Sequence, residues 1–184
     1  MIDHDRLICF DNFNRADGAL NGQAAPKGGT WSSNGASILG KLLAGINSIS
    51  ILSHVGVTQK TIYADTIHTG NNYIGIVCSY QDDSNYWFVT PQFGRFYRIY
   101  KVVAGSSTSV VGVSVGTNRF RRYIKNLRVD AETNQIIFHT DASIVQYAPE
   151  SGEELDHYQA GLENSGFFIH GSSVAKKITV VNTG

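Results

Sequence analysis

The sequence lacks the features of a disulfide scaffold, a membrane span and a disordered chain. Only 2 of the 184 residues are cysteine and no Cys-x-x-Cys spacing occurs, which excludes a disulfide framework. No apolar run approaches the roughly 18 residues of a membrane-spanning helix, so we expect no membrane insertion. Charged residues make up 16% of the chain and hydrophobic residues 42%, the opposite of a disordered composition.

An excess of charge of one sign is also missing. Lys and Arg total 15, Asp and Glu total 15, and the formal net charge is +0. Because binding to nucleic acid relies on bulk positive charge, we expect no nucleic-acid partner. The first residues are acidic and polar, whereas a signal peptide needs a basic start and an apolar stretch. We therefore expect a protein that leaves the cell inside a particle, and we predict a virion location.

Motifs typical of enzymes are absent or stand in the wrong context. Residues 112–116 match the G-x-S-x-G pattern of hydrolases, but Ser114 alternates with valines and no helix follows. None of the 6 histidines has metal-ligand spacing. No predicted strand carries carboxylates at i and i+2, and Glu150, Glu153 and Glu154 belong to an acidic loop. We predict a protein that is not an enzyme and binds no cofactor.

Short apolar runs separated by Gly, Asn, Asp and Ser are what the chain does contain, and they predict an all-β protein. The predicted strands are residues 36–43, 46–53, 60–68, 73–80, 85–90, 95–103, 108–115, 119–129, 135–140, 143–148, 165–170 and 175–182. Such strands, with turns every 8–12 residues or so, favour a sandwich or barrel. We expect one β-sandwich domain over residues 1–184, with residues 1–8 as an extended arm.

Residues 73–115 are expected to form a four-stranded meander with turns at residues 81–84, 91–94 and 104–107. Alternation along the strands then predicts a core face of Ile74, Ile76, Cys78, Trp87, Val89, Phe96, Tyr100, Val102, Val111, Val113 and Val115. The opposite, solvated face holds Tyr73, Ser79, Tyr86, Thr90, Arg95, Tyr97, Lys101, Thr108 and Ser114. Arg98 falls on the core face, so either it reaches an edge or a carboxylate, or the register there is displaced by one.

The solvated face predicts a glycan-binding platform. Its proposed contacts are Tyr73, Tyr86 and Tyr97, with Arg95 and Lys101. Aromatic rings offer apolar faces to the C–H surfaces of a sugar, and charged groups bind its hydroxyl or acid groups. Ordinary strand propensity or a contact with another protein would use the same residues.

A local basic patch lies further along the chain. It consists of Arg119, Arg121, Arg122 and Lys125, to which Arg128 adds a further charge. Such a patch could meet an anionic glycan, a nucleic acid or an acidic partner subunit, and we assign the first four residues to contact with a partner subunit. The alternative is a solvated edge strand, where Lys and Arg deter pairing with other chains.

The N-terminal segment FDNFNRADGALNG at residues 10–22, followed by GTW at residues 29–31, resembles the opening of concanavalin A-like (laminin-G-like) jelly-roll domains. Residues 74–87 and 178–182 resemble that family's hairpin and closing strand. The resemblance, to domains found in phage tail and virion proteins, implies an antiparallel two-sheet jelly roll. The alternating acidic motif of the family's glycanases is absent, which implies binding or scaffolding. Some relatives hold a structural calcium, and Asp11 and Asp17 leave such a site open.

Together these patterns predict a non-enzymatic, virion- or tail-associated structural protein that binds a cell-surface glycan as an adhesin or decoration subunit. We expect a homo-oligomer that contacts other virion subunits, because many copies convert weak sugar contacts into avidity. One alternative is a purely structural subunit that packs through the tyrosine face or the basic patch. Another is a glycoside hydrolase or lyase with an unrecognised site.

Overall fold

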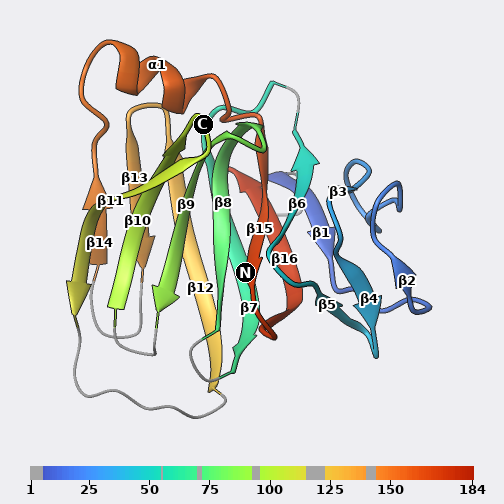
Figure 1. Ribbon diagram of the computed structural model, residues 1–184. Helices are drawn as coiled ribbons and strands as arrows, with labels where there is room; N and C mark the ends of the chain where they lie inside the picture. Colours follow the sequence, from blue (N-terminus) through green and yellow to red (C-terminus); the bar gives the residue numbers. More distant parts are fainter. Residues whose placement is uncertain (1–5, 55, 70–71, 93–95, 115–122, 140–143) are drawn as a thin grey trace.

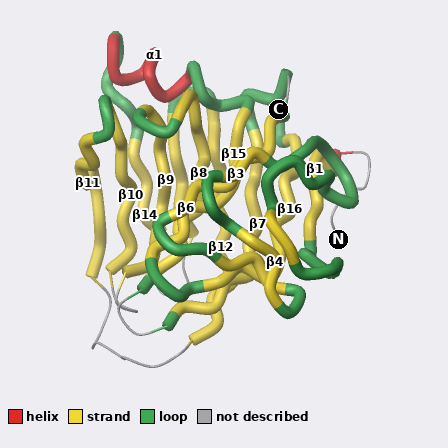
Figure 2. Tube along the Cα trace, turned by 45° about the vertical axis from the view of Figure 1, so that its right-hand side comes forward, coloured by secondary structure: helices red, strands yellow, loops and turns green. Residues whose placement is uncertain are grey.

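Two antiparallel sheets packed face to face account for most of the chain, one in front of the other in Figure 1. The computed structural model describes all residues except 1–5, 55, 70–71, 93–95, 115–122 and 140–143. The prediction of an all-β, two-sheet antiparallel sandwich of the jelly-roll kind is confirmed. A short helix, α1 (Glu153–Gln159), crosses one end of the strands and is drawn red in Figure 2. No helix in the described parts of the chain is long and apolar enough to cross a membrane.

The larger sheet has nine strands in the order β14-β13-β12-β7-β16-β5-β4-β2, and β1 pairs with β16. Its strands are β1 (Leu7–Asp11), β2 (Gly18–Ala19), β4 (Ser37–Leu39), β5 (Leu42–Ala44), β7 (Lys60–His68), β12 (Tyr123–Glu132), β13 (Gln135–His139), β14 (Ile144–Tyr147) and β16 (Val174–Asn182). Leu7, which we predicted in an extended arm, is already paired with Val181 in β16.

The smaller sheet has seven strands in the order β11-β10-β9-β8-β15-β6-β3. These strands are β3 (Ser32–Ser33), β6 (Ser48–Ser53), β8 (Tyr73–Asp82), β9 (Asn85–Gln92), β10 (Phe96–Val103), β11 (Ser106–Ser114) and β15 (Asn164–His170). Its inner face and that of the larger sheet enclose the core, which includes Trp31, Trp87 and Phe167. Apart from bulges, inward positions alternate with outward ones along these strands, so side chains also line the outer face of this sheet.

The opening segment is held by one buried carboxylate. Asp11 has no exposed surface and accepts hydrogen bonds from the backbone N–H of Phe13 (2.7 Å), both terminal nitrogens of Arg15 (2.6 and 3.1 Å) and Nε1 of Trp31 (2.7 Å). A positive φ of 53° at Phe13 turns the chain back, so that Arg15 reaches Asp11. Phe13 and Trp31 pack in the core with ring centroids 5.7 Å apart. The aromatic and charged residues of the opening motif therefore form one structural unit.

The register of β10 corrects our assignment of faces. Phe96 pairs with Gln92 and Ile99 pairs with Val89, so three residues connect β9 to β10 where we expected four. Because opposite residues share a face, this one-residue difference reverses every side chain of β10. Tyr97 therefore points into the core with 1% exposure, and our prediction that it faces outward is wrong. The prediction that Phe96, Tyr100 and Val102 belong to the core face is wrong for the same reason.

A buried lysine anchors the segment that follows α1. Lys60, fully buried in β7, donates from Nζ to the backbone carbonyl oxygens of Leu162 and of Asn164, the latter at 3.0 Å. Burial lowers the pKa of Lys60 from its ordinary value of 10.5 to about 7. The unfolded chain therefore holds this proton between about pH 7 and 10.5 while the folded chain releases it.

Stability should accordingly rise with pH through this window. We expect the free energy of unfolding to increase by roughly 2 kcal/mol between pH 7 and pH 9 from Lys60 alone. Urea denaturation at several pH values measures the increase, and Lys60→Met is the reference because it removes the titrating group. Equal pH profiles for the two proteins would contradict a lowered pKa at Lys60.

Candidate functional site

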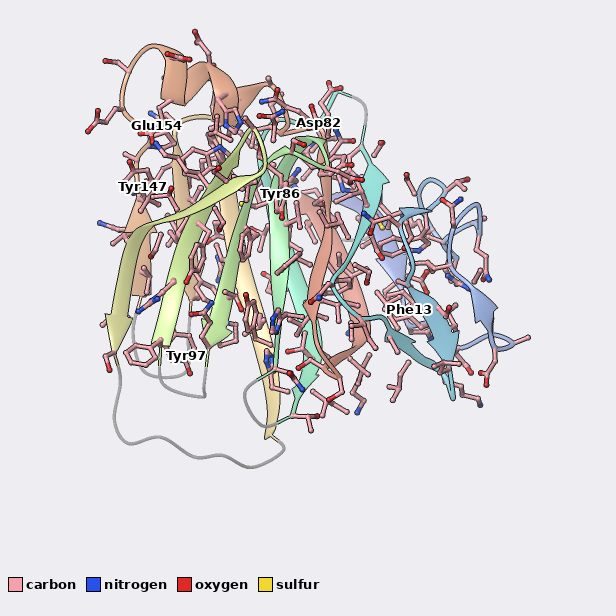
Figure 3. The ribbon with its side chains drawn as sticks, in the orientation of Figure 1. Phe13, Asp82, Tyr86, Tyr97, Tyr147 and Glu154 are labelled. Atoms are coloured by element: carbon pink, nitrogen blue, oxygen red, sulfur yellow. The ribbon has the colours of Figure 1, made fainter. Side chains whose placement is uncertain are left out.

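A second apolar cluster lies on the outer face of the seven-stranded sheet, on the side away from the core. Neighbouring strands β8, β9, β10 and β15 supply its rings, which are Tyr73, Tyr80, Tyr86, Phe88, Tyr100 and Phe168. Aliphatic side chains Ile49, Ile51, Val77 and Val102 complete it. We call these ten residues the aromatic face. Figure 3 labels Tyr86 within it and Asp82 at the end of β8 nearest α1.

Strand alternation and one bulge bring the rings together. On β9, Tyr86 and Phe88 point outward while Trp87 points into the core. On β8, a bulge between Val77 and Ser79 lets both Cys78 and Ser79 point inward, where the Ser79 hydroxyl donates to the carbonyl oxygen of Tyr158 (2.6 Å). The bulge thereby turns Tyr80 outward, beside Tyr86, with ring centroids 6.3 Å apart.

The rings pack on each other in fixed geometry. Tyr100 stacks on Phe88 with centroids 4.9 Å apart and planes inclined by 7°, and Phe168 contacts Phe88 at 5.0 Å. Phe88 is only 3% exposed and Tyr86 only 7%, because their neighbours cover them. The half-buried rings of Tyr73, Tyr80, Tyr100 and Phe168 form the part that a ligand can reach. The buried rings hold these four in place.

Different polar groups border the two ends of the aromatic face. At the end near α1, the carboxylate of Asp83 accepts hydrogen bonds from the Tyr80 hydroxyl (2.8 Å) and from Nδ2 of Asn34 (3.2 Å). At the other end, the Tyr100 hydroxyl accepts from Arg98 (3.2 Å) and donates to Gln92 (3.1 Å). The face is therefore an apolar floor with hydrogen-bonding groups at both rims.

The tyrosine hydroxyls of this face are neutral at pH 7, and burial moves the pKa of two of them further from that pH. Burial raises the pKa of Tyr73, to which the nearby Tyr100 hydroxyl adds, and it raises the pKa of Tyr86. Hydrogen bonds from Asn85 and from the backbone N–H of Ser84 lower the pKa of Asp82, which stays ionised at the acidic rim. The face thus offers flat apolar rings, protonated hydroxyls and a few carboxylates, groups suited to binding a polyhydroxylated ring.

Of the predicted glycan contacts, Tyr73 and Tyr86 lie in the aromatic face. Tyr97 is a core residue, and Arg95 lies outside the described residues. The expectation that Lys101 shares this face is also wrong, since Lys101 pairs with the core residue Trp87 across the strands and forms an ion pair with Glu154 of α1. The prediction missed four rings of the face, Tyr80, Phe88, Tyr100 and Phe168. Phe88 lies two residues after Tyr86 on the same predicted strand, so strand alternation could have placed it on the same face as Tyr86.

The predicted basic patch lies almost entirely beyond the described residues. Arg119, Arg121 and Arg122 belong to residues 115–122, and the side chain of Lys125 in β12 is likewise not described. The assignment of these residues to a partner contact stays a prediction.

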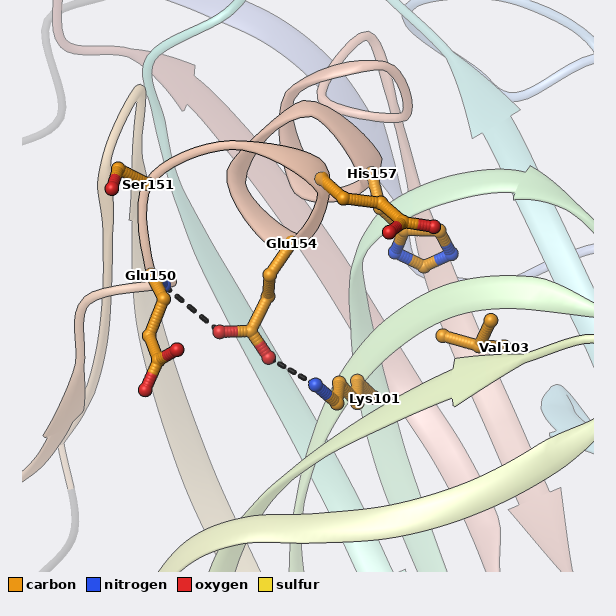
Figure 4. Close-up of a pocket in the computed structure, with 7 residues that line it drawn as sticks. Lys101, Val103, Glu150, Ser151, Glu154 and His157 are labelled. Atoms are coloured by element: carbon orange, nitrogen blue, oxygen red, sulfur yellow. Dashed lines mark hydrogen bonds and ion pairs between the residues drawn. The ribbon is translucent and has the colours of Figure 1, made fainter.

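A hollow of about 410 Å³ lies between α1 and the end of β10 (Figure 4). Its lining is Lys101, Val103, Glu150, Ser151, Glu153, Glu154 and His157. Glu154 accepts hydrogen bonds from Lys101, from the Tyr147 hydroxyl (2.9 Å) and from the backbone N–H of Glu150 (2.8 Å). Burial acts to raise the pKa of Glu154, but these donors outweigh it and lower that pKa. Glu154 therefore serves as an ionised structural carboxylate that fixes α1 to the sheet.

The calcium site left open by the sequence is not supported at Asp11. Four protein donors already fill the two oxygens of this carboxylate, and Oδ1 of Asp17 accepts from the backbone N–H of Gly40 (2.8 Å). Within the described residues, no three His, Cys, Asp or Glu side chains cluster as metal ligands would.

No protein-family model matches the sequence, and a search of curated proteins finds no match. Solved structures do resemble the fold. The CBM2 module of the evolved Dit protein of Lactobacillus casei BL23 phage J-1 aligns with a TM-score of 0.57 at 10% identity, covering 97% of each chain. The carbohydrate-binding module CBM66 from Bacillus subtilis aligns with a TM-score of 0.54 at 14% identity, covering 82% of this chain and 90% of that module.

A glycoside hydrolase also contains a similar sandwich. The GH43 protein BlXynB from Bacillus licheniformis aligns with a TM-score of 0.64 at 10% identity over 98% of this chain. The chain spans only 40% of that protein's length. At such low identities the three alignments establish the architecture, a two-sheet β-sandwich that occurs both in carbohydrate-binding modules and as a part of larger hydrolases.

Proposed function

We propose that the protein is a non-catalytic glycan-binding module that stacks a saccharide on its aromatic face. The observation that carries this proposal is the rigid platform of Tyr100 and Phe168 on Phe88, bordered by hydrogen-bonding groups at both rims. Sugars combine apolar C–H faces with equatorial and axial hydroxyls, so they match a floor of rings with a polar border. The carbohydrate-binding modules among the structural neighbours support the same reading.

We further propose that the module works on a phage particle as a tail-associated adhesin or decoration subunit. The support is the similarity to a module of a phage Dit protein over 97% of both chains. Many copies in a symmetric oligomer, held by other virion subunits, would give useful avidity from weak single sites. Mass spectrometry of particles purified from the source culture tests this location, and absence of the chain from the particles contradicts it.

A glycan array tests the binding proposal. We expect wild-type protein to bind at least one class of saccharide, and Tyr100→Ala or Phe168→Ala to weaken binding by roughly tenfold, because each change removes a reachable ring. Tyr63→Ala is the matched control, since Tyr63 is an exposed tyrosine of β7 in the other sheet. Absence of binding, or equal losses in all three variants, would contradict the proposal and favour a purely structural subunit.

The same saccharides test the absence of catalysis. The aromatic face is built from neutral rings, and the two carboxylates described at its rim, Asp82 and Asp83, are adjacent in sequence at the same end of the face. Glycoside hydrolysis needs two carboxyl groups on either side of the scissile bond. We expect no new reducing ends after prolonged incubation with bound oligosaccharides. Release that Glu153→Gln abolishes would instead identify the hollow beside α1 as a hydrolytic site.

A further inference from the structure

At one rim of the aromatic face stands an arginine that has no acidic partner among the described residues. Arg98 of β10 points outward, and its side chain is half-buried. Its guanidinium carbon lies 5.1 Å from the ring centroid of Phe96, and one terminal nitrogen donates to the Tyr100 hydroxyl at 3.2 Å. A ring and a hydroxyl therefore hold the guanidinium in a defined place.

The neighbouring edge strand makes room for this side chain. Gly112 of β11 pairs with Arg98, and a Cβ atom at Gly112 would lie 2.6 Å from Cγ of Arg98. The aliphatic part of the Arg98 side chain therefore lies directly over Gly112, where any residue with a Cβ atom would clash with it. This is a second, independent constraint on where the guanidinium sits.

No described carboxylate neutralises Arg98, whereas two other arginines each form an ion pair with an aspartate. Arg15 pairs with Asp11 and Arg128 pairs with Asp130. A guanidinium has five N–H donors in a planar fork that fits a carboxylate or phosphate group. Only one donor is used within the described structure, by Tyr100. The remaining donors are available to an anionic group on a ligand.

Resting on the proposed glycan function, we propose that the ligand is an acidic saccharide whose carboxylate or phosphate group binds Arg98. The sugar ring that carries the group then lies on Tyr100, which adjoins Arg98 and stacks on Phe88. The opposite rim bears Asp82 and Asp83, so like-charge repulsion there directs an anion to the Arg98 end. Arg98 is accordingly the residue that sets both the charge preference and the direction of the bound chain.

The test compares matched saccharides on wild-type and variant protein. The probes are oligogalacturonate, its fully methyl-esterified neutral form and a glycerol phosphate polymer that carries sugar substituents, each measured by isothermal titration after the array. We expect wild-type protein to prefer an anionic probe over the neutral one by about tenfold, and this preference to shrink as salt rises. Comparison of the carboxylate and phosphate probes identifies which anion fits.

Substitutions assign the preference to its residue. Arg98→Gln should abolish the preference for the anionic probe, whereas Arg98→Lys should keep part of it, because lysine retains the charge and loses the fork. Gly112→Ala should also reduce it, since the added methyl group displaces the Arg98 stem. Arg128→Gln, at an arginine of the other sheet, is the control and should change nothing.

The outcomes separate this inference from the function on which it rests. Binding that depends on Tyr100 but shows no preference for charge overturns the acidic ligand and leaves the glycan function standing. A charge preference that survives Arg98→Gln overturns the role of Arg98. If no saccharide on the array binds, both proposals fail together.

Discussion

Replacing Asp11 by alanine is expected to lower the free energy of unfolding by about 3 kcal/mol or more, because it leaves a partly buried cation and two buried donors without their acceptor. Arg15 would lose both of its hydrogen bonds to the carboxylate, and Nε1 of Trp31 would lose its acceptor inside the core. The backbone N–H of Phe13, which turns the chain into the core, would also be left unsatisfied.

Urea denaturation followed by far-ultraviolet circular dichroism measures this loss. The control is Arg128→Gln, which removes an ion pair on the surface, where the Arg128 side chain is 46% exposed. Exposed pairs are worth about 1 kcal/mol or less, so the control should shift the midpoint only slightly. Similar shifts for the two variants would show that Asp11 does not organise the opening segment.

The sequence predicted part of this unit. The segments FDNFNRADGALNG and GTW marked this part of the chain through their resemblance to the opening of the jelly-roll family. The choice of Asp11 could not be predicted, because it depends on the positive φ of Phe13, a conformation that phenylalanine rarely adopts. The fold imposes that conformation to place the Phe13 ring beside Trp31.

Tyr97→Ala and Tyr100→Ala are expected to have opposite consequences. Tyr97 is a fully buried core residue whose ring meets Phe138 at 5.9 Å, so its loss should lower the free energy of unfolding by about 3–5 kcal/mol. Glycan affinity of the molecules that remain folded should be unchanged. Tyr100 lies on the aromatic face, so its loss should weaken binding and cost less stability.

Thermal denaturation and glycan titration on the same preparations separate the two roles. Titrations are run well below the melting temperature of the Tyr97 variant, so that unfolding does not imitate a loss of affinity. If Tyr97→Ala weakened binding at full stability, the register of β10 described above would be wrong, and the outward placement expected from sequence would be right.

This register is the clearest case in which sequence patterns were insufficient. A predicted turn of four residues before β10 placed the charged side chain of Arg98 on the core face. That unfavourable placement was the one sign in the sequence that the predicted register was wrong. A connection of three residues returns Arg98 to the outer face and places Tyr97 in the core. The number of residues in a loop decides which side chains of the next strand face the core. Pro and Gly mark where a turn lies, but they do not determine its length to within one residue.

Long alternating strands were otherwise well predicted, whereas short paired segments were not. The predicted strand at residues 60–68 matches β7. The predicted strand at residues 36–43 is instead the hairpin of β4 and β5, where Gly40 and Lys41 both take positive φ. Such a two-residue turn interrupts an apolar run without a proline or a polar cluster, so hydrophobic periodicity alone does not reveal that the run is two strands.

The placement of the indole side chains has an optical consequence. Trp31 and Trp87 are the only two tryptophans of the chain, and both lie in the core, at 1% and 0% exposure. Their emission should shift to the red when the chain unfolds and stay nearly constant when a saccharide occupies the outer face of the sheet. Ultraviolet difference absorption of the phenolic rings, four of which are tyrosines of that face, is therefore the label-free signal for titrations.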